Sequence, residues 1–520
     1  MRETRILTAA QMRWADQASA RTGVSTAELM DRAGAAIATA VIECMPDYGR
    51  IVIIAGPGNN GGDGFAAAYY LRERRLPVTV VSLMPLADLS DDIKTYADRA
   101  SQAGAKIREA CSESCLAELG RWLVRASMVV DCMFGTGLSR PLQGRMLDVV
   151  GRINISDRVV LSVDIASGIC ADTGRVLGGA VQADFTLPIA ATKWGHWLNE
   201  GRDYTGKLLI AADIGIADTT IQEAWTASRD SELDKNCFCV KSSSVVHDGF
   251  LKQAWPERSR LSHKGSYGHV WIFGGSTGFT GAPQLAGLGA YAAGAGLASI
   301  VCPDEVWAVI AAANLEVMVH PQSAADWHEA DALVIGPGWG KSQQSLLSAL
   351  LEAEQPMVID ADALNIVAAS QTLQQKLAAR TQITVITPHP GEAARLLDLT
   401  VEEVQCDRKK TIMALTTRYD CRVVLKGSET LIGTPDKDIY LNPFGSAQLA
   451  VAGSGDVLAG MIGAQLARTE MESVSLDVLI SAAVALHGKA GDSSHWYLAG
   501  ELAKKVAEMR QHIERDGKVC

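Results

Sequence analysis

The sequence has no excess of basic residues. Asp and Glu number 59 against 48 Lys and Arg, and the formal net charge is −11 at pH 7. A phosphate backbone requires a positively charged surface, so this balance argues against a nucleic-acid partner. It leaves open a phosphorylated small molecule, because one pocket can be locally cationic or lined with backbone amides. The length of 520 residues predicts two or three domains.

Paired cysteines and an apolar leader are also missing. None of the eleven cysteines forms a Cys-X-X-Cys pair. The closest pairs, Cys237 with Cys239 and Cys111 with Cys115, have no partner His or Cys at zinc spacing. The first residues, MRETRILTAAQMRWAD, carry charges throughout, unlike a signal peptide. We therefore expect a soluble cytoplasmic protein with reduced thiols.

Charged side chains are absent from residues 265–303. A stretch of this length could contain a transmembrane helix. Ten glycines and Pro283 interrupt it, however, which favours a buried strand, loop, helix and strand packed through small residues. We expect no membrane partner.

Short apolar runs alternate with helix-like stretches in the first half. Apolar residues recur at three- and four-residue spacing between most of the runs, which are 51–56, 78–83, 128–132, 159–164 and 208–213. This alternation predicts an α/β domain whose parallel sheet is covered by helices on both faces. A helix capped by Thr8 should precede it. The pattern fades near 217–241, which places a first domain at 1–220, a linker at 221–240 and a second domain at 241–520.

The second half repeats this style with a different sequence. Its apolar runs are 270–275, 298–302, 332–338, 357–362, 383–390 and 423–427. All of these runs except 298–302 have Gly, Asp, His or Lys in their last two positions. In open α/β sheets, ligands bind at the carboxyl ends of the strands, so functional residues are sought there.

Two glycine-rich turns each lead into a helix-like run, "GPGNNGGDGF" at 56–65 and "VAGSGDVLAG" at 451–460. In the second turn, unpaired backbone N–H groups at a helix start would bind a transferring phosphoryl group. Asp456 could accept a proton from a substrate hydroxyl. A plain helix N-cap explains this turn equally well when it is taken alone.

Four further strand ends in the second half carry polar groups. "LKGSET" supplies Lys426, "TPHPGE" supplies His389 and Glu392, and "DADALN" and "GPGWG" supply carboxylates and close backbone approach. A solvated strand end would also account for Lys426, and a lone histidine is often structural. The convergence of so many such ends favours a binding site for a nucleotide and its acceptor.

Three strand ends in the first half form a comparable set. The first turn, "GPGNNGGDGF", is not the GxGxxG dinucleotide fingerprint, and a tight strand–helix turn is the alternative explanation. "DCMFGTGLSRPLQG" (131–144) offers an Asp, a Gly-Thr-Gly loop and Arg140, which suits a phosphate. "VDIASG" (163–168) ends in Asp164 and Ser167.

These motifs closely resemble two known families. "HKGSYGHVWIFGGSTGFTGAP", "GPGWG", "DADALN", "TPHPGE", "LKGSET" and "AGSGDVLAG" resemble the ADP/ATP-dependent NAD(P)H-hydrate dehydratases over roughly 250–490. "LTAAQMRWAD", "LMDRAG" and the first-half motifs resemble the NAD(P)H-hydrate epimerases over roughly 5–216. Together the halves resemble the bifunctional NAD(P)H-hydrate repair enzymes. The resemblance implies two three-layer α/β sandwiches, the N-terminal one Rossmann-like and the C-terminal one ribokinase-like.

The resemblance also implies roles. The first half would interconvert the R and S hydrates of NADH or NADPH. The second would use ADP with Mg²⁺ to phosphorylate the hydroxyl of the S hydrate and eliminate phosphate, which leaves AMP. Asp164 and Asp456 would be catalytic. K⁺ would be held by Asn60, Asp131 and Ser167.

The remaining site residues follow from the same motifs. The hydrate would contact Asn59, Asn60, Gly61, Gly62, Asp63, Gly135, Thr136, Gly137, Leu138, Ser139, Arg140, Pro141, Gly338 and His389. The nucleotide would contact Lys426, Gly427, Ser428, Glu429, Thr430 and Gly455. We also expect a homo-oligomer.

Some residues depart from the family pattern. Ala166 and Leu315 stand where proline is usual, and the stretch after Asp492 lacks the usual small-residue ending. Two alternatives stay open on the residues alone. The second half could be a small-molecule kinase of ribokinase type fused to a Rossmann-like binding domain, and the first half could be a non-catalytic interaction module.

Overall fold

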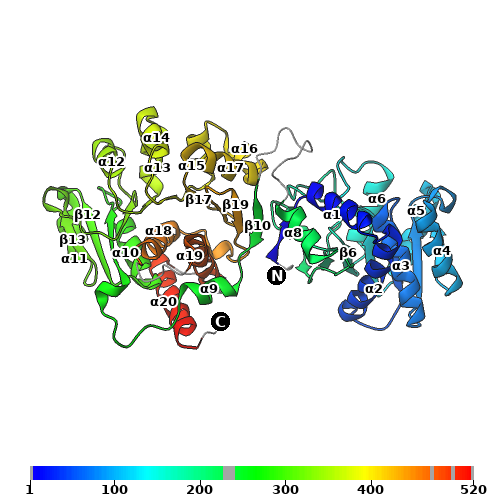
Figure 1. The fold of residues 1–520 in the computed structure, drawn as a ribbon. Coiled ribbons are helices and arrows are strands. Elements are labelled where there is room, and N and C mark those ends of the chain that lie inside the picture. Colours follow the sequence, from blue (N-terminus) through cyan, green and yellow to red (C-terminus); the bar gives the residue numbers. More distant parts are fainter. Residues whose placement is uncertain (1–3, 227–239, 469–473, 493–497, 517–520) are drawn as a thin grey trace. The chain divides into compact units, whose positions relative to one another are not determined.

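The computed structural model describes residues 4–226, 240–468, 474–492 and 498–516. The chain divides into two compact units, residues 1–235 and 236–520 (Figure 1). Most of the predicted linker, 221–240, lies outside the described residues. Its first part belongs to helix α8 (Asp218–Thr226), whose Ile221 and Ala224 are buried in the core of the first unit. The first unit therefore extends at least to Thr226.

The first unit is built on a seven-stranded parallel sheet with the order β4-β3-β2-β5-β6-β7-β9. Its strands are β2 (Ile51–Ala55), β3 (Val78–Ser82), β4 (Lys106–Glu109), β5 (Met128–Cys132), β6 (Val159–Val163), β7 (Phe185–Leu187) and β9 (Lys207–Leu208). Every residue of β2, β3 and β5 is buried, as expected for strands covered on both faces. The expected parallel sheet is confirmed.

The strand predicted at 208–213 is wrong in extent. Strand β9 stops at Leu208, and beyond it only Ala212 makes an isolated bridge, to Ile189. Ile210 is exposed, so the apolar composition of this run does not reflect a buried strand.

Helices cover both faces of this sheet. They are α1 (Ala9–Arg21), α2 (Thr26–Cys44), α3 (Asn59–Glu73), α4 (Asp91–Gln102), α5 (Glu113–Val124), α6 (Arg145–Asn154) and the short α7 (Gly201–Thr205). Helices α2 to α4 share one apolar core with the sheet, and α5 and α6 share a second one. Thr8 caps α1 through a capping box with Gln11, which confirms the predicted helix start. A separate parallel pair joins β1 (Ile6–Leu7) to β8 (Thr192–Lys193).

The second unit contains a mixed ten-stranded sheet with the order β10-β19-β18-β17-β16-β15-β14-β11-β12-β13. Its strands are β10 (Ser242–Val245), β11 (His269–Phe273), β12 (Leu297–Cys302), β13 (Met318–Pro321), β14 (Ala332–Ile335), β15 (Met357–Ile359), β16 (Thr384–Ile386), β17 (Arg422–Leu425), β18 (Leu431–Gly433) and β19 (Asp438–Leu441). Only β17–β18 and β18–β19 pair antiparallel. The seven neighbouring strands β17, β16, β15, β14, β11, β12 and β13 therefore run parallel and place their carboxyl ends along one edge of the sheet.

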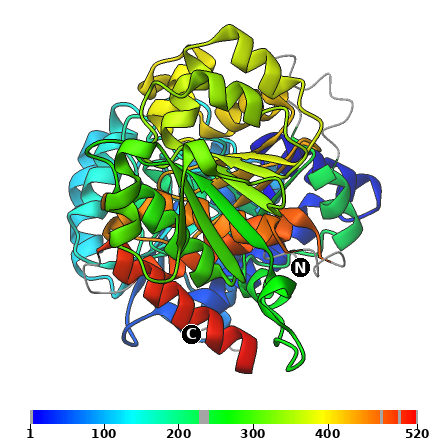
Figure 2. The ribbon, with the colours of Figure 1, turned by 90° about the vertical axis from the view of Figure 1, so that its left-hand side faces the viewer.

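Helices form a layer on each side of this sheet (Figures 1 and 2). One layer holds α9 (Asp248–Ala254), α10 (Gly281–Ala293), α18 (Ser454–Leu466), α19 (Leu476–Gly491) and α20 (Ala499–Asp516). The other holds α12 (Gln344–Leu350), α13 (Ala361–Ala368), α14 (Gln371–Ala378), α15 (Pro390–Leu397), α16 (Val401–Cys406) and α17 (Arg408–Tyr419), while α11 (Asp304–Ala312) follows β12 at the sheet edge. The expected three-layer α/β architecture is confirmed in both units.

The uncharged segment 265–303 forms β11, α10 and β12, as predicted. Helix α10 packs closely on α18 through glycines. A Cβ atom on Gly460 would lie 1.8 Å from the carbonyl oxygen of Ala286, and one on Gly289 would lie 2.1 Å from that of Val457. None of the helices in the described residues is long and apolar enough to cross a membrane.

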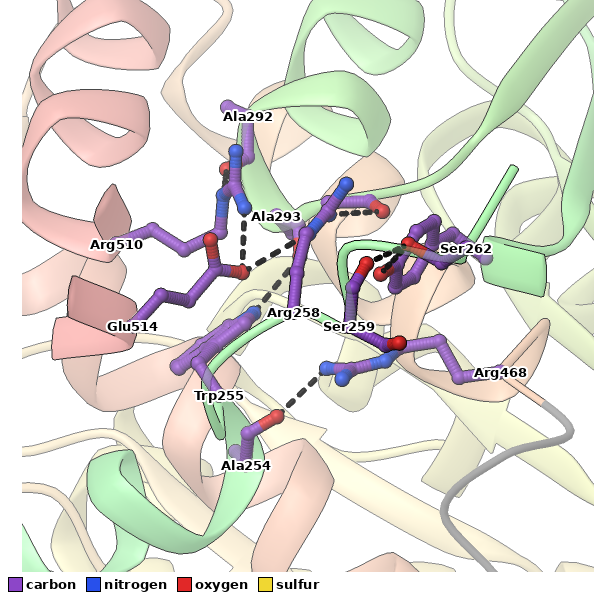
Figure 3. A network of polar contacts seen from close by, with 12 residues as sticks. Ala254, Trp255, Arg258, Ser259, Ser262, Ala292, Ala293, Arg468, Arg510 and Glu514 are labelled. Atoms are coloured by element: carbon purple, nitrogen blue, oxygen red, sulfur yellow. Dashed lines mark hydrogen bonds and ion pairs between the residues drawn. The ribbon is translucent and has the colours of Figure 1, made fainter. Parts of the chain in front are cut away.

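Helix α20 is anchored to the end of α10 (Figure 3). The last carbonyls of α10 accept hydrogen bonds from Arg510 Nε (2.8 Å, to Ala292), Trp255 Nε1 (2.8 Å, to Ala293) and an Arg258 nitrogen (2.7 Å, to Gly294). Glu514 pairs with both arginines. The departure from the family pattern at 493–497 lies outside the described residues, but the helix that follows it is well packed.

Candidate functional sites

The predicted residues of the first unit lie at the carboxyl ends of β2, β5 and β6. Strand order reverses between β2 and β5, and this switch point is where open α/β sheets bind ligands. Residues 59–63 form the first turn of α3, 135–141 follow β5, and Asp164 follows β6 directly. The Thr136 N–H donates to Asp164 Oδ2 at 2.9 Å, and Asn60 Nδ2 donates to the Val163 carbonyl at 3.3 Å. The three motifs therefore meet in one place.

The loop after β5 meets Asp164 at one end only. A Cβ atom on Gly135 would lie 2.6 Å from Asp164 Oδ2, so glycine allows the close approach. Gly137, Ser139, Arg140 and Pro141 are exposed. This half of the loop lies open to solvent.

Asp164 forms a buried ion pair with Lys193 of β8. The lysine Nζ contacts Asp164 Oδ1 and also donates to the Ile189 carbonyl at 2.7 Å. Burial alone would raise the pKa of Asp164, but the charge and hydrogen bond of Lys193 outweigh it and hold the pKa below its usual value. Asp164 is therefore ionised at neutral pH.

Two further carboxylates interact with this pair. Burial raises the pKa of Asp63 well above its usual value, and the charges of Asp164 and Asp16 add to the effect. Asp16, on α1, is close enough to Lys193 and Asp164 for their charges to affect its own pKa. Asp164 and Asp16 thus lie in the field of one buried ammonium group, and Asp63 lies in the field of those two carboxyl groups.

Asp131 is held in place at the end of β5. Its carboxylate accepts hydrogen bonds from Ser167 Oγ (2.6 Å), Ser162 Oγ (2.8 Å), Ser167 N (2.9 Å) and Met133 N (3.1 Å). Burial nevertheless raises the pKa of Asp131, and these hydrogen bonds lower it only in part. The nearby motif residue Asn60 has a buried Oδ1 without a hydrogen-bond partner. A cation here would satisfy Asn60 and favour the charged form of Asp131.

The predicted residues of the second unit lie at consecutive strand ends. Asp360 follows β15, His389 lies beyond β16, and Lys426 follows β17. Lys426 Nζ pairs with Asp360 Oδ1 at 2.7 Å. A Cβ atom on Gly455 would lie 3.4 Å from Lys426 Nζ. This brings the start of α18 next to the ion pair.

Asp456 lies in the first turn of α18 and does not cap it. The N-cap residue is Gly453, in the left-handed conformation and without a side-chain hydrogen bond, which disfavours the alternative that this turn is only a helix cap. No hydrogen-bond donor among the described residues contacts the Asp456 carboxylate. Burial raises its pKa to about 7, and Asp360 adds to this while Lys426 opposes it. Asp456 can therefore exchange a proton near neutral pH.

His389 caps a helix. Its Nδ1 accepts the N–H groups of Gly391 (3.0 Å) and Glu392 (3.4 Å) and so caps α15. Its Nε2 lies 3.3 Å from Glu392 Oε1. Burial raises the pKa of Glu392 to about 7 in spite of Lys426.

Two loops near this centre are shaped by glycine and by neighbouring side chains. Gly338 has φ +60°, and a Cβ atom there would lie 2.6 Å from the Phe279 carbonyl oxygen, so only glycine fits easily. Its own carbonyl accepts from Ser276 Oγ at 2.8 Å. The loop 426–430 is held by buried Arg408, whose guanidinium donates to the carbonyls of Leu425 (3.1 Å), Lys426 (3.3 Å) and Ser428. Through these carbonyls, Arg408 holds the backbone of the loop that is predicted to bind the nucleotide.

Comparison with known proteins also separates the chain into a first and a second part that match different families. A family model for NAD(P)H-hydrate dehydratase matches residues 270–510, and one for the YjeF-related protein N-terminus matches 26–195. The bifunctional NAD(P)H-hydrate repair enzyme of Coxiella burnetii is 34% identical over 93% of both chains. The Escherichia coli enzyme of that name is 31% identical over 94% of this chain and 90% of its own. The chain belongs to the family of bifunctional NAD(P)H-hydrate repair enzymes.

One solved structure is similar to about half of this chain. The ADP/ATP-dependent NAD(P)H-hydrate dehydratase of Bacillus subtilis, co-crystallised with ATP and Mg²⁺, is 31% identical and covers 52% of this chain and 98% of its own, with a TM-score of 0.45. Three buried residues at the two sites were missed by the sequence reasoning: Lys193, His196 and Arg408. The only signal for Lys193 was a lone charge within the apolar stretch 187–198.

Proposed function

We propose that this member of the repair family restores hydrated NADH and NADPH in two steps, epimerisation in the first unit and nucleotide-dependent dehydration in the second. Family membership over nearly the whole chain supports the overall activity. The observation that carries the assignment of the second site is the Asp456 carboxylate, with a pKa raised to about 7 at the start of α18 and next to Lys426.

The dehydratase step uses the second site. Nucleotide phosphates bind the free N–H groups at the start of α18 and the ammonium of Lys426, with residues 427–430 and Gly455 along the nucleotide. Gly338 and His389 line the hydrate. Asp456 takes the proton from the ring hydroxyl, the hydroxyl oxygen attacks the terminal phosphorus of ADP, and the bond from that phosphorus to the AMP oxygen breaks. Phosphate then leaves with the C–O bond electrons while the neighbouring ring carbon releases a proton to water, which gives NAD(P)H, phosphate and AMP.

Mg²⁺ fits this site as a companion of the nucleotide. Among the described residues, no group of three or more His, Cys, Asp or Glu side chains is arranged to hold a metal by itself. Mg²⁺ often binds through the substrate phosphates and only one or two carboxylates, so it would enter the site together with the nucleotide. Bound there, Mg²⁺ would neutralise charge on the phosphates.

The epimerase step uses the first site. Residues 59–63 and 135–141 bind the hydrate, and Asp164 is the acid–base group at the hydrated carbon. Because Lys193 keeps Asp164 ionised, it begins as the base. Asn60, Asp131 and Ser167 would hold K⁺ through hard oxygen atoms, and the unpartnered Asn60 Oδ1 supports this. When bound, K⁺ would supply a positive charge that orients the anionic substrate.

The test is the recovery of NADH absorbance from a mixture of R and S hydrates with ADP, Mg²⁺ and K⁺. Full recovery from the wild-type chain is expected. Asp164→Asn should stop recovery at the S fraction, whereas Asp456→Asn should slow recovery of both forms by roughly 10²- to 10⁴-fold. A stable phosphorylated product in place of NADH would favour the small-molecule kinase, and full recovery by Asp164→Asn would favour a non-catalytic first unit.

Three finer points remain proposals. ADP is taken as the phosphoryl donor, and the same assay with ATP compares the two nucleotides. The cytoplasm is the proposed compartment, supported by the thiol form of the eight cysteines in the described residues. A homo-oligomer remains a prediction, which light scattering on the purified chain would test.

A further inference from the structure

Asp164 holds an unfavourable backbone conformation. Its φ is +70°, a region that residues other than glycine enter at a cost and that persists only where the surroundings enforce it. The Asp164 N–H donates to the Leu187 carbonyl at 2.8 Å. This bond fixes the residue from one side, and the opposite, carbonyl side needs a partner of its own.

His196 supplies that partner. Its Nε2 lies 2.7 Å from the Asp164 carbonyl oxygen, and its Nδ1 lies 3.0 Å from the Lys193 backbone nitrogen. Since Lys193 N–H can only donate, Nδ1 is the acceptor and the ring proton is on Nε2. The imidazole therefore joins the backbone of Asp164 to the backbone of Lys193, and the side chains of the same two residues form the ion pair.

The surroundings keep this ring rigid and uncharged. Both His196 and Lys193 have no exposed surface. Burial, together with the Lys193 charge, lowers the pKa of His196 to about 4. Gly195 N–H donates to the Ala171 carbonyl at 2.7 Å, which fixes the turn that carries the histidine. The histidine therefore stays neutral throughout the neutral range.

We propose that His196 is a positioning residue of the epimerase site, which holds Asp164 in its positive-φ conformation so that the carboxylate faces Lys193 and Thr136 N–H. This inference rests on the proposed acid–base role of Asp164. The groups that face Asp164 are Lys193, His196, Asp63 and Asp16. Of these, His196 is the one whose hydrogen bond goes to the backbone carbonyl of Asp164 and not to its carboxylate.

The first test compares His196→Leu with His196→Gln in the full-length chain. The leucine removes both hydrogen bonds, whereas the glutamine amide again offers a donor and an acceptor. We expect leucine to lower the epimerase kcat by about 10- to 100-fold with little change in KM, and glutamine to restore part of it. The acid limb of the epimerase pH profile should move to higher pH in His196→Leu, because a displaced Asp164 loses part of its pairing with Lys193.

His487 gives a matched control in the second unit. It is likewise buried, and its Nε2 lies 2.9 Å from the Ser454 carbonyl oxygen at the start of α18. His487→Leu should leave the epimerase rate and its pH profile unchanged. An epimerase defect of equal size in both variants would mean general damage to the chain and would overturn the proposal.

The outcomes separate this inference from the proposed function. If Asp164→Asn is inactive as an epimerase and His196→Leu retains the wild-type rate and pH profile, the acid–base assignment stands and the positioning role is wrong. If both substitutions at 196 prevent folding, nitrogen-15 NMR of histidine in the wild-type chain still decides. A His196 ring protonated on Nε2 and unchanged from pH 5 to 9 is expected, and titration within that range excludes the proposal.

Discussion

Both units place a buried lysine–aspartate pair at the carboxyl ends of parallel strands, but they use it differently. In the first unit, the paired carboxylate, Asp164, is itself the proposed acid–base group, and Lys193 lowers its pKa. In the second, Lys426 pairs with Asp360, and the proposed base is the unpaired neighbour Asp456, with a pKa raised to about 7. The first arrangement keeps the Asp164 carboxyl group ionised at neutral pH, whereas the second allows Asp456 to gain or lose a proton there.

The difference matches the chemistry each site has to perform. Reversible inversion at one carbon is served by a carboxylate that is ionised, and so ready to act as a base, over the whole neutral pH range. Phosphoryl transfer brings a polyanion next to the base, and a carboxyl group that can be protonated tolerates that approach more easily. The environment of two similar carboxylates thus determines two roles, as pKa tuning does in other enzymes.

Replacing the two lysines should change the stability and activity of the two units more than the other substitutions at these sites. Lys193→Met leaves Asp164 buried without its counter-charge, which should destabilise the first unit by about 3 to 5 kcal/mol and abolish epimerisation. The double variant Lys193→Met/Asp164→Asn should regain most of the stability and none of the activity. Urea unfolding of the full-length chain and the epimerase assay measure both. A double variant no more stable than the single one would mean that packing, and not an unpaired charge, explains the loss.

Lys426→Met is the corresponding change in the second unit. Asp360 keeps its hydrogen bond from Ala361 N–H at 2.8 Å, but the charge that opposes the raised pKa of Asp456 is lost. We expect the pKa of Asp456 to rise further and the dehydratase KM for ADP to increase at least ~10-fold, since a phosphate contact is removed. Epimerisation should not change, and a change there would contradict independent sites.

The sequence located the residues that the structure brings together in the candidate sites better than it located the residues that hold them in place. The alternation of apolar runs and helical stretches fixes the strand ends, and so Asp164, His389, Lys426 and Asp456 could be found by inspection. Lys193 could not, because it reaches Asp164 through the β1–β8 pair, a tertiary contact without a sequence pattern. Arg408 lies within a helix that begins Arg-Lys-Lys, where a buried arginine looks the same as a solvated one.

The two activities should differ in pH dependence. Asp456 must be ionised to accept a proton, and its pKa is raised to about 7, so the dehydratase rate should fall about tenfold per pH unit below pH 7. The pKa of Asp164 is held below its usual value, so the epimerase rate should be level over the same range. Rates of both steps on one enzyme preparation, from pH 5 to 8, make the comparison. A parallel decline would mean that the two carboxylates have similar environments.

The smallest expected effect concerns stability. A carboxyl group whose folded-state pKa is raised binds its proton more tightly when folded, so it destabilises the protein as pH rises from the unfolded pKa near 3.8 to the folded value near 7. Asp456→Asn removes that penalty and should stabilise the second unit at pH 7.5 by on the order of 1 kcal/mol, while it slows dehydration as described above. The gain should vanish below pH 4, where Asp456 is protonated in both states.

Asp164→Asn should destabilise the first unit at neutral pH, because the lowered pKa of Asp164 contributes stability there that the variant loses. Urea unfolding of both variants at pH 4 and 7.5 measures these two changes in the free energy of unfolding, which should have opposite signs. Equal changes would mean that Asp164 and Asp456 do not differ in the way their pKa values are shifted.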